Sequence, residues 1–498
     1  MGIDTTQLKT NLDGLKEALP RDAQGTLGQK LEIALTGLGK LETGADLSLR
    51  EGMDAAYKAR NLIRLMISGI SIYDERLVQI ADDSLMGTES LGIKPELIEG
   101  LAKSLYEAKK TKSGETIAIT GAKRNIEILE AIARLCIADG VNFVIDVSNG
   151  DIDAVMINNA DDGGLQRLGE ERVKLYEPVK TKLEARSASS AQLDTAQNVK
   201  YAKALGPYYK RLGNDDLTFS LTIIPTENDA KMDGMEYDDY MRLFFEACDQ
   251  PWEEICKAQA ILIEKLDAGK ELHITNDDAT DLTLNIEGFT FINSGADANI
   301  PGSEIFSAPT KEGVNGTLVS KGCFKYGNFP MVEDIVLIFE NGKIVAAHAK
   351  EGMETLEQIL NTDEGVRYLG EIAFGTNPHL RRHSINPLLV EKIAGSFHIA
   401  AGHAYKRKED KGKPVNVYNG NESGVHWDIT TLLRGKGGKV SLDGQLIQDN
   451  GLWVGKDEEE NQKLAVLNYG WGALPADQQP DWWKERYPNG YADTSVTQ

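Results

Sequence analysis

The feature that most restricts the fold is a strand, helix and strand pattern within residues 115–147. The apolar runs "ETIAIT" and "NFVIDV" predict strands, and "NIEILEAIARLCIADG" between them has the apolar spacing of an amphipathic helix. This order predicts a βαβ unit, whose two strands run parallel in one sheet. The turn after the first run, "TGAKRN", contains neither of the common glycine-rich phosphate-binding motifs, so we interpret the unit as structural.

The regions on either side of this unit have different patterns. Residues 1–94 carry apolar side chains at three- and four-residue spacing, which predicts a helical segment, and residues 237–269 predict two more helices. Beyond residue 270 the apolar runs are short and alternating, and Asn341-Gly342 between two of them predicts a type I′ hairpin. We therefore expect an α/β plus β-rich fold, with an N-terminal helical segment (1–94), an α/β domain with a partly parallel sheet (95–270) and a C-terminal β-rich domain (271–498).

The charge balance and the cysteines exclude several classes of function. The chain has 77 acidic and 54 basic residues, and its net charge of −23 repels phosphate backbones, so we expect no nucleic-acid partner. No apolar run approaches the roughly 20 residues that cross a bilayer, so we expect no membrane span. The four cysteines are scattered and contain no C-x-x-C pair, which favours a cytoplasmic protein. Any metal site must therefore use imidazole and carboxylate ligands.

The histidines are unevenly distributed, because five of the seven lie within residues 379–426. The segment "SGVHWDIT" places His426 and Asp428 two residues apart in a predicted strand. Side chains two apart on a strand share one face, so the imidazole and the carboxylate would lie side by side while Trp427 faces the other way. Taken alone, this pattern fits either a pair of metal ligands or a satisfied polar pair.

Three glutamates occur in small, apolar surroundings that suggest burial. They lie in the segments "NIPGSEIFSAP" (Glu304), "RYLGEIAFG" (Glu371) and "LVEKIAGSFHIAAGHAY" (Glu391), and the last segment also holds His398. A buried carboxylate is unfavourable without a cation or hydrogen-bond donors. With His426 and Asp428, these residues supply four carboxylates and two imidazoles, a ligand set suited to Zn, Co or Mn.

These segments occur in the same order in the dinuclear metallo-aminopeptidases typified by the thermophilic aminopeptidase T and aminopeptidase S, and the sequence resembles this family over roughly residues 95–455. The resemblance implies a catalytic tyrosine at Tyr405 and a bridging carboxylate at Glu371, which is also a candidate general base. It implies two divalent metal ions per chain, peptide substrates with a free N-terminus, and a homodimer. The metal ligands that it implies are Glu304, Glu371, Glu391, His398, His426 and Asp428, all in the β-rich domain.

The sequence departs from the family pattern in three places. Ser303 separates Gly302 from Glu304, where the family has glycine directly before its glutamate. The link from Glu391 to His398 is longer than in aminopeptidase S, and residues 1–94 have no counterpart in the family.

The resemblance implies hydrolysis of the N-terminal peptide bond by a water that two metal ions activate, with Tyr405 donating a hydrogen bond to the developing oxyanion. Two alternatives stay open. One is a mononuclear Fe(II) ring-cleaving dioxygenase, which needs only two histidines and one carboxylate. The other is a non-catalytic peptide-binding or assembly protein that keeps the fold and its metals for stability.

Overall fold

The computed structural model describes residues 36, 48–70, 83–187, 191–213, 216–327 and 329–491. They form two compact units, each described separately below: residues up to Thr226 together with 297–300, and residues 227–296 together with those from Pro301 onward. Most of the helical segment expected over residues 1–94 lies outside the described residues, although α3 spans Leu49–Ile67. No described helix is long and apolar enough to cross a membrane.

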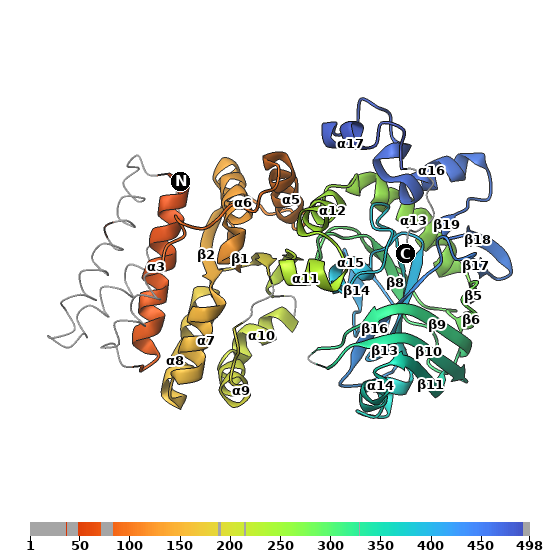
Figure 1. The fold of residues 1–498 in the computed structure, drawn as a ribbon, viewed down its shortest axis with the longest axis horizontal. Helices are drawn as coiled ribbons and strands as arrows, with labels where there is room; N and C mark the ends of the chain where they lie inside the picture. Colours follow the sequence, from red (N-terminus) through yellow and green to blue (C-terminus); the bar gives the residue numbers. More distant parts are fainter. Residues whose placement is uncertain are drawn as a thin grey trace. The chain divides into compact units, whose positions relative to one another are not determined.

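The first unit is built on a four-stranded parallel sheet with strand order β2-β1-β3-β4. The strands β1 and β2 are labelled in Figure 1. Its strands are β1 (Thr116–Ala122), β2 (Asn142–Ser148), β3 (Thr181–Arg186) and β4 (Thr218–Ile223). Helix α6 (Ile126–Asp139) connects β1 to β2, so the predicted βαβ unit is confirmed. The other helical elements are α5 (Pro95–Glu107), η1 (Lys123–Asn125), α7 (Gly150–Asn159), α8 (Asp162–Leu175), α9 (Thr195–Ala204) and α10 (Gly206–Gly213).

The strand order places a topological switch point between β1 and β3, where ligands often bind in open α/β sheets. Here the side chain of Asn125 lies at the carboxyl end of β3. Its Nδ2 atom donates to the backbone oxygens of Ala185 at 2.9 Å and Arg186 at 3.1 Å. These hydrogen bonds within the unit are consistent with a structural role for the βαβ unit.

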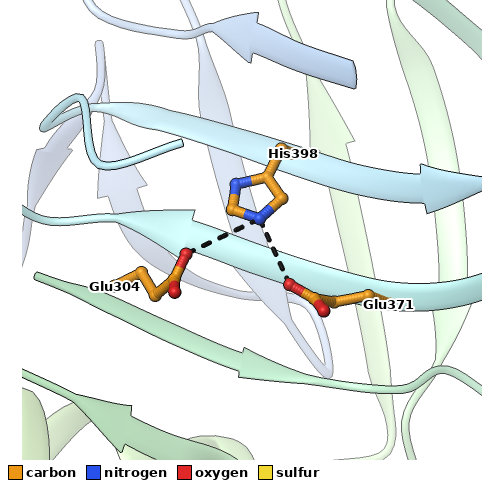
Figure 2. A group of neighbouring side chains, drawn as sticks. All are labelled: Glu304, Glu371 and His398. Atoms are coloured by element: carbon orange, nitrogen blue, oxygen red, sulfur yellow. Dashed lines mark hydrogen bonds and ion pairs between the residues drawn. The ribbon is translucent and has the colours of Figure 1, made fainter. Parts of the chain in front are cut away.

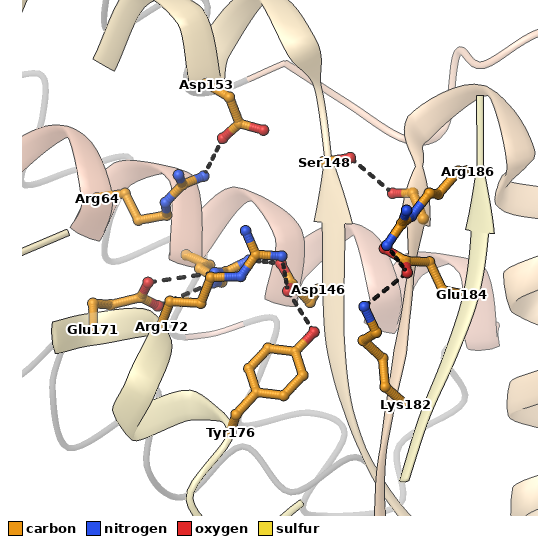
Figure 3. A network of polar contacts seen from close by, with 12 residues as sticks. Arg64, Asp146, Ser148, Asp153, Glu171, Arg172, Tyr176, Lys182, Glu184 and Arg186 are labelled. Atoms are coloured by element: carbon orange, nitrogen blue, oxygen red, sulfur yellow. Dashed lines mark hydrogen bonds and ion pairs between the residues drawn. The ribbon is translucent and has the colours of Figure 1, made fainter. Parts of the chain in front are cut away.

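A buried ion network joins the helices of the first unit to its sheet (Figure 3). Asp146 of β2 accepts hydrogen bonds from Arg172 at 3.0 Å and from the Tyr176 hydroxyl at 2.7 Å, both on the α8 side, and it is paired with Arg60 of α3. Burial by itself would raise the pKa of Asp146, but Arg172 and Arg60 hold it well below its ordinary value. The carboxylate is therefore ionised and fully paired.

The second unit contains two larger antiparallel sheets and one small hairpin. The eight-stranded sheet has the order β11-β10-β9-β6-β5-β17-β18-β19, and the five-stranded sheet has the order β16-β13-β12-β8-β7. The strands of the first are β5 (Glu271–Thr275), β6 (Asp281–Asn285), β9 (Val314–Phe324), β10 (Val332–Glu340), β11 (Lys343–Glu351), β17 (Lys439–Leu442), β18 (Gln445–Asp449) and β19 (Leu452–Trp453). Those of the second are β7 (Ile292–Ser294), β8 (Glu304–Ser307), β12 (Leu369–Gly375), β13 (Ser396–Gly402) and β16 (His426–Leu432), and the hairpin is β14 (Glu409–Asp410) with β15 (Lys413–Pro414).

Several helices accompany these sheets, and the expected α/β plus β-rich fold class is confirmed. They are α11 (Glu227–Met232), α12 (Tyr237–Cys248), α13 (Trp252–Ala268), α14 (Met353–Leu360), η2 (Gly365–Arg367), α15 (Pro387–Val390), α16 (Glu458–Tyr469), η3 (Gly470–Ala473) and α17 (Asp481–Arg486). The two helices predicted over residues 237–269 are α12 and α13. Both lie in the second unit. Helix α13 packs Ile255, Leu262 and Leu266 into the core of that unit. The sequence-based boundaries near residues 94 and 270 stay predictions.

The predicted hairpin is also present, because Asn341 (φ 48°) and Gly342 (φ 81°) connect β10 to β11 in the left-handed conformation of a type I′ turn.

The core of the second unit covers one face of the five-stranded sheet. Side chains on this face, including Phe374, Phe397 and Trp427, are at most 2% exposed. Burial of this face fixes the register of the strands, since a slip of one residue would turn every apolar side chain outward.

Candidate metal centre

Five of the six predicted metal ligands lie on the face of the five-stranded sheet opposite the apolar core. They occur at alternate positions with respect to the buried residues Ile305, Ile372, Phe397, Ile399 and Trp427. Because successive side chains of a strand point to opposite faces, burial of the apolar residues directs the polar ones to one common surface. The five candidate ligands are Glu304 on β8, Glu371 on β12, His398 on β13, and His426 and Asp428 on β16.

A bulge at Gly370 sets the position of Glu371 within this surface. Leu369 pairs with Ala401, but Glu371 pairs with Ala400, so Gly370 is an extra residue in β12. A Cβ atom at Gly370 would lie 2.1 Å from the backbone oxygen of His403, so only glycine fits this close approach.

Small residues separate the ligands on the polar face. Ala400 lies between Glu371 and Asp428 across the three strands, Ala373 lies opposite His398, and Gly375 lies opposite Glu304. The absence of longer side chains at these positions leaves space above the sheet between the carboxylates and imidazoles.

The first group of ligands consists of Glu304, Glu371 and His398, all buried (Figure 2). Nε2 of His398 lies 3.2 Å from Oε1 of Glu371 and 3.7 Å from Oε2 of Glu304. One ligand atom from each residue lies within 4.8 Å of the others, which is close enough to share one ion. Figure 2 shows both carboxylates directed toward the same ring nitrogen.

The second group consists of Glu371, His426 and Asp428. One ligand atom from each of these residues again lies within 4.8 Å of the others. Nε2 of His426 lies 3.6 Å from Oε2 of Glu371 and 3.4 Å from Oδ1 of Asp428. Glu371 therefore belongs to both groups, with one carboxylate oxygen directed toward each histidine. This is the arrangement expected of a carboxylate that bridges two ions.

Backbone contacts orient His426 for ligation. Its Nδ1 atom lies 2.8 Å from the backbone oxygen of His403, so Nδ1 carries the hydrogen and Nε2 faces the carboxylates. Such an outer hydrogen bond fixes the tautomer and orientation of a metal-binding histidine.

The two imidazoles have raised pKa values. Burial alone would lower both values, but Glu371, Asp428 and Glu304 raise the pKa of His398 to about 9. Asp428 and Glu371 likewise raise the pKa of His426 to about 10. Burial raises the pKa of Glu371. The carboxylates thus attract positive charge to this face.

The donor set fits divalent cations. Carboxylate oxygens and imidazole nitrogens suit Zn, Co or Mn, and both groups combine the two ligand types. Oδ1 of Asp428 is buried and accepts no hydrogen bond from the described residues, although His426 lies 3.4 Å away. A cation at this position would satisfy the oxygen.

The sixth predicted ligand, Glu391, is in neither group. It follows the last residue of α15, and its Oε2 atom lies 2.9 Å from Nζ of Lys392. Burial raises the pKa of Glu391 to about 7, although Lys392 opposes this shift. The ligand role of Glu391 stays a prediction.

Lys392 is a residue of the centre that the sequence interpretation missed. Its side chain is 1% exposed, and its Nζ atom also lies 2.7 Å from Oε1 of Glu304. Burial alone would lower the pKa of Lys392, but Glu304 and Glu391 raise it above its ordinary value. The available signal was a lysine within the apolar run "LLVEKIAGSF", where a buried cation needs carboxylate partners.

Ser303, one of the three departures from the family pattern, has a strained backbone directly before Glu304. Its φ of 95° is unusual for a residue with a side chain, and the residue is fully buried. The hydroxyl lies 2.7 Å from Oγ1 of Thr376, and the backbone nitrogen donates to the oxygen of Gly295 at 2.7 Å. Gln259 of α13 donates to Thr376 at 2.9 Å and to the backbone oxygen of Glu304 at 3.2 Å. Strain of this kind persists only where surrounding contacts hold it.

Tyr405 lies beyond the end of β13, beside the second group. Its ring centre is 4.9 Å from that of His426 and 6.0 Å from that of Phe306. The residue as a whole is 47% exposed. Desolvation of its hydroxyl and the carboxylates of the centre, led by Glu371 and Asp428, raise its pKa, so the hydroxyl is protonated at neutral pH.

A family model described as thermophilic metalloprotease (M29) matches residues 96–453. Among curated proteins, aminopeptidase AmpS of Bacillus subtilis is 32% identical over 226 residues, which are 39% of this chain and 54% of that protein. Aminopeptidase T of Thermus thermophilus is 36% identical over 137 residues, which are 26% of this chain and 33% of that protein. The chain thus spans about half the length of the first relative and a third of the second.

The solved structure of wild-type AmpT from Thermus thermophilus has a similar fold. It superposes on the chain with a TM-score of 0.58 at 23% sequence identity. The superposition covers 72% of this chain and 99% of AmpT, so almost the whole fold of AmpT has a counterpart here.

Proposed function

Because the chain belongs to the family of thermophilic metalloproteases (M29), we propose that it is a metallo-aminopeptidase that hydrolyses the N-terminal peptide bond of peptides. The position of Glu371 is the observation that carries this proposal. Its two oxygens lie 3.2 Å from His398 and 3.6 Å from His426, so one carboxylate joins two separate ligand groups. The names of the related aminopeptidases support the same reaction class.

Each ligand group would hold one divalent ion, which we propose to be Zn, Co or Mn. Glu304 and His398 would complete the first site, His426 and Asp428 would complete the second, and Glu371 would belong to both. Ions held by these residues would supply Lewis-acid chemistry, which polarises a carbonyl and lowers the pKa of a bound water toward ~7. Glu371, the carboxylate common to both groups, is our candidate general base.

Tyr405 would act on the oxyanion that forms at the scissile carbonyl. Its raised pKa keeps the hydroxyl protonated, so the group can donate a hydrogen bond to negative charge. Contacts with the His426 and Phe306 rings hold the tyrosine beside the ligands, and its partial exposure leaves it accessible to substrate. A carboxylate of the centre would hold the free α-amine of the substrate, which explains a restriction to N-terminal residues.

The proposal is tested by preparing metal-free protein with a chelator and restoring it separately with Co²⁺, Zn²⁺ and Mn²⁺. We expect mass spectrometry to show stepwise removal of residues from the N-terminus of a peptide panel, while the N-acetylated peptides stay intact. Failure of every restored protein to cleave peptides or aminoacyl-anilides would reject the proposal. Activity that needs Fe²⁺ and oxygen would favour the ring-cleaving dioxygenase.

The resemblance to the family also leads us to propose a homodimer that works in the cytoplasm. Sedimentation equilibrium of the full chain would give the mass of the assembly, and a mass equal to one chain would reject the dimer. Fractionation of cells that produce the protein would test its location.

A further inference from the structure

A buried ammonium group lies among the carboxylates of the proposed centre. Nζ of Lys392 is 2.7 Å from Oε1 of Glu304 and 2.9 Å from Oε2 of Glu391. The lysine side chain is only 1% exposed. A lysine in this position needs both carboxylates to offset the loss of hydration.

The contacts of Lys392 divide the oxygens of Glu304 between two partners. Oε1 is engaged by the ammonium group, whereas Oε2 is 3.7 Å from Nε2 of His398 and faces the first ligand group. Glu304 thus presents one oxygen to an ion at that site. The ammonium group stands on the other side of the same carboxylate.

The backbone at Lys392 is held firmly against the end of β12. The backbone nitrogen of Asn377 donates to the oxygen of Lys392 at 2.8 Å. A Cβ atom at Gly375 would lie 2.3 Å from the oxygen of Ile393 and 2.8 Å from the carbonyl carbon of Lys392. This close packing fixes where the lysine side chain starts and therefore which carboxylates its ammonium group reaches.

We infer that Lys392 is a positioning residue that keeps Glu391 out of the metal coordination shell and restricts Glu304 to one coordinating oxygen. The inference rests on the proposed function, because it concerns the same centre. The coordination set in this chain is then five residues: Glu304, Glu371, His398, His426 and Asp428. The ammonium charge also repels a cation at the first ligand group, so that group binds its ion more weakly than the second.

Two single variants test whether Glu391 is a ligand. We expect Glu391→Gln to keep two ions per chain by elemental mass spectrometry and to leave the visible absorption of the Co²⁺-loaded protein unchanged. We expect Lys392→Arg, which keeps the positive charge, to give the same spectrum as the unaltered chain. Loss of an ion in Glu391→Gln, or a changed Co²⁺ spectrum, would overturn the inference because it would identify Glu391 as a ligand.

Removal of the ammonium group tests the positioning role directly. In Lys392→Met, Glu391 and the second oxygen of Glu304 become available, so we expect the weaker Co²⁺ dissociation constant to fall at least tenfold. The visible absorption should weaken as the coordination number rises. The double variant Lys392→Met/Glu391→Gln should recover much of the original spectrum, because one added ligand is absent. A Lys392→Met protein with unaltered affinity and spectrum would reduce Lys392 to a structural ion pair.

These measurements separate the two proposals. If the unaltered chain binds neither Co²⁺, Zn²⁺ nor Mn²⁺, the proposed function fails. If it binds two ions and the Glu391→Gln spectrum changes, only the inference about Lys392 fails. Should Lys392→Met not fold, a changed Co²⁺ spectrum in Glu391→Gln would still overturn the inference.

Discussion

The imidazole of His426 donates a hydrogen bond from Nδ1 to the backbone oxygen of His403, 2.8 Å away. His403 directly follows β13, and His426 begins β16 opposite Gly402, where the two strands pair. The contact leaves Nε2 of His426 directed toward Asp428 and Glu371. The ligand is thus oriented by a carbonyl group whose own position depends on the absence of a side chain at Gly370.

Gly370→Ala is expected to damage the second ligand group. The new Cβ atom would meet the His403 oxygen at 2.1 Å, so the carbonyl must move away from His426. We expect loss of one bound ion by elemental mass spectrometry and at least a tenfold loss of kcat. Gly206→Ala is the matched control, since its Cβ atom would meet nothing within 4 Å. Equal metal content in both variants would contradict this account of His426.

Ser303→Ala and Ser303→Gly separate backbone strain from hydrogen bonding. Both variants lose the contact with Thr376, which costs roughly 1–3 kcal/mol when a buried partner is left unsatisfied. Only glycine also relieves the strain at φ 95°, which is worth about 1–3 kcal/mol. We therefore expect urea unfolding to show Ser303→Gly as the more stable of the two variants. The reverse order would mean that the positive φ is not strained.

Asp146→Asn should destabilise the first unit without changing the metal content. The substitution leaves the buried guanidinium groups of Arg60 and Arg172 without their shared carboxylate, and breaking a buried pair typically costs about 3–5 kcal/mol. Urea unfolding would measure this loss against Glu99→Gln, an exposed acidic residue on α5. Because the pKa of Asp146 is lowered in the fold, its contribution is present above its ordinary pKa of about 3.9 and is lost as the pH falls below it. The Asn variant should lack that part of the acid dependence.

His383 is expected to make stability depend on pH between about 4 and 6.5. Burial lowers its pKa to about 4, although Asp233 opposes the shift. Between these values the unfolded chain binds a proton that the folded chain does not, so stability is lost as the pH falls through the window. The full shift corresponds to about 3 kcal/mol.

His383→Phe removes the titrating group and retains an aromatic ring against Phe324, whose centre lies 5.0 Å from the imidazole. Urea midpoints at pH 7 and pH 4.5 should therefore differ less in the variant than in the unaltered chain. An equal pH dependence in the two proteins would show that His383 is protonated equally well in both states.

Tyr405→Phe should lower turnover without removing metal. The substitution removes only the phenol hydroxyl group. Deletion of one oxyanion donor typically lowers kcat by a factor of about 10²–10³. Elemental mass spectrometry should find the same ion content as in the unaltered chain, and KM should change little. An unchanged kcat would exclude Tyr405 from the reaction.

The strand face that the five candidate ligands share could be predicted largely from local sequence patterns. The spacing of His426 and Asp428 on either side of Trp427 places them on one strand face, and the apolar residues that flank Glu304 and Glu371 do the same for those residues. Strand periodicity depends only on neighbouring residues, so a single sequence contains the information. The βαβ unit and the turn at Asn341-Gly342 were predictable for the same reason.

The missed features depend on contacts between distant parts of the chain. Lys392 pairs with Glu304, which lies 88 positions earlier in the sequence. No local pattern shows that these two side chains meet. The bulge at Gly370 is defined by its pairing with β13, and the φ of Ser303 is maintained by Gln259 and Thr376. Each of these features affects the orientation of a candidate ligand side chain. None of them changes which residues are the candidates.

The two ligand groups are completed at different times during synthesis. Glu304, Glu371 and His398 precede Gly402 in the sequence. His426 and Asp428 lie on β16, which is the last strand of the five-stranded sheet in chain order and forms one edge of that sheet. A ribosome adding about 5–20 residues per second needs roughly one to five seconds to make the 24 residues from Gly402 to His426 (426 − 402 = 24). A nascent chain thus has the residues for one ion before those for the other exist. Under the proposed function, translation itself sets the earliest moment at which the second ion can bind.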